Sequence, residues 1–75
     1  MSYSNNSLNQ AKRALRESTL HALRELEVEQ AGDSLVISGK VTSFYHKQMA
    51  QEIVRSVCRD IELCNAVDVM SVIDH

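Results

Sequence analysis

The sequence predicts one small α+β domain with the element order αββαβ, in which two helices pack on one face of a three-stranded mixed sheet. Apolar residues recur at helical spacing in two segments of the chain. Three other segments alternate apolar and polar residues or are rich in β-branched residues, as strands are. With 75 residues the chain is too short for two domains, so these elements share one core.

The first helix is predicted to begin near Ser7 and to end near Glu17. Its apolar residues follow the three-four spacing of an amphipathic helix. They are Leu8, Ala11 and Leu15. Residues 1–7 form a Ser- and Asn-rich arm that we expect to be disordered, and residues 8–75 form the domain.

A break is predicted directly after this helix. Ser18 and Thr19 compete for backbone hydrogen bonds and favour an interruption. Three leucines then turn back under the core. They are Leu20, Leu23 and Leu26. One continuous helix to Glu25 is the alternative.

A β-hairpin is predicted over residues 26–41. Residues 26–30 alternate apolar and polar, and the turn residues 31–33, which include Gly32, precede a second strand over 34–41. One face of the second strand carries Leu35, Ile37, Gly39 and Val41. Gly39 leaves room for a close approach, and we expect the second helix to pack there.

The second helix has N-cap candidates at Thr42 and Ser43. Its apolar stripe is the strongest helical signal in the chain. The stripe comprises Met49, Ala50, Ile53, Val54, Val57 and Ile61. The β-branched segment 64–73 is the last strand, with Val67 and Val69 directed inward.

In the predicted sheet the first strand is central and the other two strands flank it. If the second and third strands run parallel, the helix between them makes a right-handed crossover. The uncovered face is then mostly polar, with an apolar trace. It carries Glu27, Glu29, Val36, Lys40, Asp68 and Met70.

The net charge of −2 argues against a general nucleic-acid binder, because such domains usually carry a basic surplus. Residues 1–25 carry four basic and two acidic residues, whereas residues 26–75 carry four basic and eight acidic ones. An anion-seeking surface is therefore expected near the N-terminal third. The chain shows no membrane span and no signal peptide, which predicts a cytoplasmic protein.

Catalysis, a cofactor and a bound metal are not expected. Cys58 and Cys64 have no zinc spacing, and in the cytoplasm they stay reduced as small apolar residues, buried or half-buried. The three histidines are scattered. They are His21, His46 and His75. His46 falls near the core side of its helix and is expected to be half-buried and hydrogen-bonded.

Two groups of residues are candidates for contact with a partner. Helical geometry directs Phe44 and Tyr45 away from the core, with Lys47 nearby, so they either contact a partner or pack locally on the hairpin or the N-terminal arm. The second group either contacts anionic lipid headgroups or is a solvated helix face. It consists of Lys12, Arg13 and Arg16.

The segment 26–41 closely resembles the hairpin of the BON domain, a bacterial module of osmotic-stress and nodulation proteins. The resemblance extends over about residues 8–73 and includes Lys47, Ala50 and the closing pattern around Asn65. It implies that Asn65 has a structural role. Asp60 replaces a glycine of the family pattern, so its turn is made by a residue less tolerant of positive φ. Cys64 replaces a valine.

This resemblance implies a non-catalytic binding module. We expect a protein–protein interaction or a homo-oligomer, and the alternative is a peripheral domain that binds anionic phospholipid. The partner itself is not indicated by the sequence.

Overall fold

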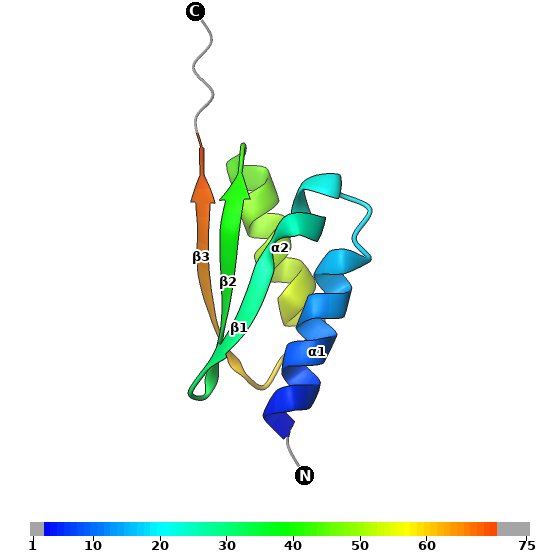
Figure 1. The fold of residues 1–75 in the computed structure, drawn as a ribbon, viewed down its shortest axis with the longest axis vertical. Coiled ribbons are helices and arrows are strands. Elements are labelled where there is room, and N and C mark those ends of the chain that lie inside the picture. Colours follow the sequence, from blue (N-terminus) through cyan, green and yellow to red (C-terminus); the bar gives the residue numbers. More distant parts are fainter. Residues whose placement is uncertain (1–2, 71–75) are drawn as a thin grey trace, which may run out of the picture.

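The structure, a computed structural model, describes residues 3–70 and has the predicted αββαβ architecture with one additional 3-10 turn (Figure 1). Both helices lie on the same side of a mixed three-stranded sheet, as predicted. The elements are α1 (Tyr3–Arg16), η1 (His21–Glu25), β1 (Glu27–Ala31), β2 (Ser34–Val41), α2 (Phe44–Val57) and β3 (Glu62–Val69).

Helix α1 begins at Tyr3, earlier than predicted, so residues 3–7 of the expected arm are helical. Residues 1 and 2 lie outside the described residues. The helix ends at Arg16, and the Ser18 hydroxyl accepts a hydrogen bond of 3.0 Å from the Leu20 N–H. This local bond competes with helix continuation. The predicted break is confirmed, and the alternative of one helix to Glu25 is wrong.

The strand order is β1-β2-β3, so the prediction of a central first strand is wrong. β2 pairs antiparallel with β1 and parallel with β3. The five-residue β1 carries Glu27 and Glu29, whereas β2 has eight residues and the continuous apolar run 35–37. A short charged strand suits the edge of a sheet, and a longer apolar strand suits its centre.

The two glycines serve the hairpin in different ways. Gly32 has a φ of 61° at the first of two turn residues, as a type II′ turn requires. Gly39 has a φ of 131°, and a Cβ atom placed on it would meet Leu26 first. The expectation that Gly39 lies beneath the second helix is therefore wrong, because the chain entering β1 takes that space.

Helix α2 is capped by Ser43, whose hydroxyl accepts a hydrogen bond of 3.2 Å from the His46 N–H. The helix ends at Val57, so Ile61, the last member of the predicted stripe, lies in the following loop. Val57 itself is 41% exposed. No described residue other than glycine has a positive φ, so the turn at Asp60 forms without the left-handed conformation we had expected.

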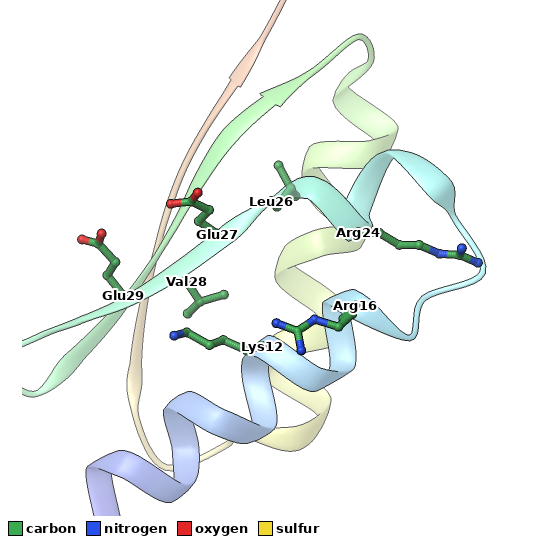
Figure 2. A pocket seen from close by; sticks show the side chains of 7 residues that line it. All are labelled: Lys12, Arg16, Arg24, Leu26, Glu27, Val28 and Glu29. Atoms are coloured by element: carbon green, nitrogen blue, oxygen red, sulfur yellow. The ribbon is translucent and has the colours of Figure 1, made fainter.

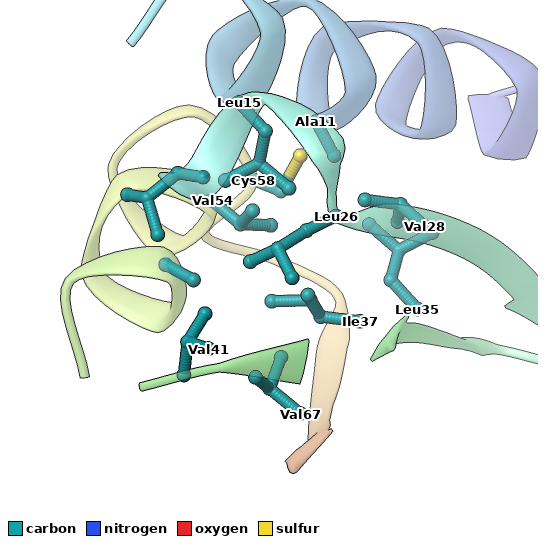
Figure 3. Close-up of a cluster of buried hydrophobic side chains, with 12 residues drawn as sticks. Ala11, Leu15, Leu26, Val28, Leu35, Ile37, Val41, Val54, Cys58 and Val67 are labelled. Carbon is teal, nitrogen blue, oxygen red and sulfur yellow. The ribbon is translucent and has the colours of Figure 1, made fainter. Parts of the chain in front are cut away.

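The core lies between the helices and the inner sheet face (Figure 3). Val67 of β3 is buried and Val69 packs against the core, as predicted, whereas Ile73 lies outside the described residues. The opposite sheet face is uncovered, and its expected residues are exposed or half-buried. The buried apolar residues are Ala11, Leu15, Leu23, Leu26, Val28, Leu35, Ile37, Val41, Ala50, Val54, Cys58 and Val67.

Candidate binding surfaces

The first candidate surface lies at the N-terminal end of α2. Phe44 is 75% exposed and Tyr45 is 62% exposed, so neither ring is buried by the hairpin or by α1. Both side chains therefore point outward, as the helical geometry predicted. Phe44 and Lys47 border an open hollow of about 290 Å³ between α2 and β3. We call Phe44, Tyr45 and Lys47 the aromatic surface.

Asn65 of β3 fixes this end of α2 to the sheet. Its side-chain amide donates hydrogen bonds to the Lys47 carbonyl at 2.9 Å and to Gln51 Oε1 at 3.2 Å. Its carbonyl Oδ1 accepts a hydrogen bond of 3.2 Å from the Val67 N–H. Asn65 thus holds the backbone of Lys47, and with it the first turns of α2, in a defined position beside β3.

The second candidate surface lies beside the edge of β1 (Figure 2). Lys12 and Arg16 of α1 border a groove of about 250 Å³ together with Arg24 of η1. The Arg24 side chain is oriented by a 2.8 Å hydrogen bond from its Nε to the Ser18 carbonyl. The groove is completed by Leu26, Glu27, Val28 and Glu29. We call it the β1 groove.

The predicted contact residues thus divide between two surfaces. Lys12 and Arg16 line the β1 groove, and the aromatic surface borders a different hollow. Arg13 is exposed but pairs with Glu17 at 3.6 Å on the α1 surface. Arg24 was not among the predicted site residues. The sequence signal that could have identified Arg24 was its position among the surplus basic residues of the N-terminal third.

The two cysteines lie in different environments. Cys58 is buried, and its thiol donates a hydrogen bond of 3.3 Å to the Ser7 carbonyl. Burial raises the pKa of the Cys58 thiol, because ionisation there loses hydration. Cys64 is exposed on the uncovered sheet face, so the expectation that it is at least half-buried is wrong.

His46 is half-buried, as predicted, and its ring centroid lies 5.8 Å from that of Tyr45. Its buried Nδ1 has no hydrogen-bond partner among the described residues, so the expected bond is not found at that atom. Over residues 3–70, no three His, Cys, Asp or Glu side chains cluster closely enough to hold a metal ion. The described helices include none with the length and apolarity needed to span a membrane.

Comparison with known proteins finds no protein-family model and no curated protein that matches this chain.

Proposed function

We propose that this chain is a non-catalytic, BON-like binding module that contacts another protein through the aromatic surface. The observation that carries the proposal is the exposure of two adjacent aromatic rings, Phe44 and Tyr45, at one end of α2. Aromatic side chains contribute large contact areas, and they are enriched among the residues that dominate binding energy at protein interfaces. The resemblance of the hairpin to the BON domain supports the same class of function.

Further features of α2 favour this surface over the rest of the helix. The first backbone N–H groups of a helix lack partners within the helix and favour an anionic group, and Ser43 caps one of them. Lys47 adds a positive charge close to Phe44. A partner that presents an apolar pocket beside a carboxylate would complement both the rings and the charge.

The decisive experiment replaces both rings. Phe44→Ala with Tyr45→Ala is expected to keep the melting temperature near that of the parent, because the two rings are exposed, and to abolish concentration-dependent self-association in sedimentation or capture of the partner. Val57→Ala is the matched control, because Val57 is an exposed apolar residue at the other end of α2. Unchanged association in a folded double variant would refute the aromatic surface.

A second set of variants tests the alternative of a phospholipid-binding domain. Lys12, Arg13 and Arg16 are all exposed on α1, which is the observation that favours this alternative. Flotation of the parent with anionic vesicles, lost when these three residues become glutamine, would support lipid binding. Association with protein and no flotation would support the interaction module.

A further inference from the structure

The β1 strand forms one edge of the sheet, and its pairing leaves backbone groups directed outward. Ala31 and Ser34 face each other across the two-residue turn, so they form a hydrogen-bonded pair. Hydrogen-bonded and non-bonded pairs alternate along an antiparallel ladder. The N–H and C=O groups of Val28 and Gln30 therefore point away from β2, toward the free edge.

On the other edge of the sheet, one outward backbone group near the centre of β3 is already hydrogen-bonded. Alternate residues of a strand direct their backbone groups to opposite sides, and the Val67 N–H bonds to the Asn65 side chain. That side chain also bonds to α2, so it cannot leave without loss of three hydrogen bonds. Of the two edges, β1 is therefore the one where strand addition would displace no hydrogen bond found among the described residues.

The groove beside β1 has charges on both of its sides. Figure 2 shows Lys12 and Arg16 on the helix side of β1, and Glu27 and Glu29 directed to the opposite side. Among the described residues, neither Lys12 nor Arg16 has a carboxylate within ion-pair distance, whereas Arg13 pairs with Glu17. Two cations thus stand beside the edge without anionic partners.

Val28, whose backbone groups point toward this edge, is itself covered. Val28 is only 3% exposed, and the Lys12 side chain lies next to it along the groove. A lysine over an edge strand is a common way to prevent unwanted pairing. Because a lysine side chain is long and flexible, an acidic group on an incoming strand can draw it aside.

We propose that β1 binds an extended acidic segment of another protein as a fourth, antiparallel strand. Residues of the added strand opposite Val28 and Gln30 share their side of the sheet, so acidic side chains there meet Lys12 and Arg16. Residues opposite Glu27 and Glu29 lie next to carboxylates and must be uncharged or basic. The recognised pattern is therefore an acidic residue at every second position.

A second copy of this chain does not fit the same edge. Antiparallel pairing of two β1 strands with Val28 opposite Val28 or Gln30 places Glu29 of one copy opposite Glu27 or Glu29 of the other, and pairing of Gln30 with Gln30 leaves only residues 29–31 of each strand in register. Like charges directly opposite each other destabilise a strand pair. A flat anionic membrane is disfavoured for a related reason, because Glu27 and Glu29 border the same groove.

The β1 groove is separate from the aromatic surface, so the proposal for either surface can be refuted without refuting the other. The proposed probe is a fluorescently labelled peptide of about ten residues that alternates glutamate with threonine. Its binding to the full chain is followed by fluorescence anisotropy at low salt. A peptide with lysine in place of glutamate is expected not to bind, and added salt is expected to weaken the glutamate peptide.

Charge reversal tests the two cations. Lys12→Glu with Arg16→Glu should weaken binding by about tenfold or more, since two attractions become repulsions. Arg55→Glu with Arg59→Glu changes the net charge equally at exposed sites outside the groove, and it should have little effect. Equal losses in both variants would show a general charge effect and overturn the proposal. Circular dichroism verifies that both variants are folded, and the milder Lys12→Gln with Arg16→Gln replaces the first variant if it is not.

Backbone methylation of the peptide tests strand addition itself. In the antiparallel pairing the glutamate N–H groups face β1, so N-methylation of the glutamates should abolish binding, whereas N-methylation of the threonines should be tolerated. On binding, amide exchange at Val28 and Gln30 should slow. Binding of both methylated peptides would overturn the proposal, and so would an affinity of the protein for anionic vesicles equal to its affinity for the peptide. The variant with Phe44→Ala and Tyr45→Ala should bind the peptide like the parent.

Discussion

Leu26 lies directly over Gly39, so close that a Cβ atom on Gly39 would come within 2.6 Å of the Leu26 Cδ2. Leu26 is the residue between η1 and β1, and it is buried. The contact therefore joins the start of the hairpin to the far end of its second strand. Only glycine satisfies both this approach and the φ of 131° at position 39.

We expect Gly39→Ala to lower the free energy of unfolding by about 2 to 4 kcal/mol, since backbone strain adds to the contact with Leu26. Gly32→Ala is the matched control. Its φ is also positive, but a Cβ there would have no neighbour within 4 Å. It should lose only about 1 to 2 kcal/mol. Urea denaturation measures both, and equal losses would contradict the role of Leu26.

Replacement of Asn65 by alanine should destabilise the domain by about 1 to 3 kcal/mol, because the Val67 N–H loses its partner. Asn65→Asp keeps an acceptor for Val67 but loses the donor to the Lys47 carbonyl. Asn65→Asp should therefore also lower the melting temperature measured by thermal denaturation. Two melting temperatures equal to that of the parent would show that Asn65 does not hold α2.

Stability should fall above about pH 8.5, where the Cys58 thiol ionises in the unfolded chain. Burial raises the pKa of this thiol in the folded state, so the unfolded state releases its proton first and is favoured as the pH rises. Urea midpoints at pH 7 and pH 9.5 measure the decrease. Cys58→Ala should be less stable at pH 7 but show a smaller decrease, and equal decreases in both proteins would contradict the assignment.

Alkylation by iodoacetamide should modify Cys64 much faster than Cys58 in the folded protein. Cys64 is exposed, whereas Cys58 is buried and its raised pKa reduces the reactive thiolate. Mass spectrometry of peptides from a short labelling time measures the ratio. In urea the two rates should become similar, and a similar rate for both cysteines without urea would show that the Cys58 environment opens.

The periodicity of the sequence was sufficient for the faces of the elements but not for the order of the strands. Alternation identified Val67 as inward, and the same alternation places Cys64 outward, a signal that the expectation of burial overlooked. Periodicity along one strand carries no information about its neighbours. The charged residues of β1 and the apolar run 35–37 of β2 were the available signals for edge and centre.

The candidate surfaces were predictable residue by residue but not as assemblies. Helical geometry alone identified Phe44 and Tyr45 as outward-facing. It could not show that Lys12 and Arg16 border the edge of β1, because that depends on how α1 crosses the sheet. The position of Arg24 depends on the 3-10 turn, whose hydrogen bonds are not evident from residue spacing.

The Asn65 bond to Val67 also limits the stoichiometry of any assembly formed by strand pairing. Growth into a fibre requires each molecule to accept a strand at one edge and to offer a strand at the other. Here the Val67 N–H at the β3 edge already bonds to the Asn65 side chain, so a strand added at β3 would have to displace that hydrogen bond. The proposed addition at β1 would therefore favour small, discrete complexes over extended fibres.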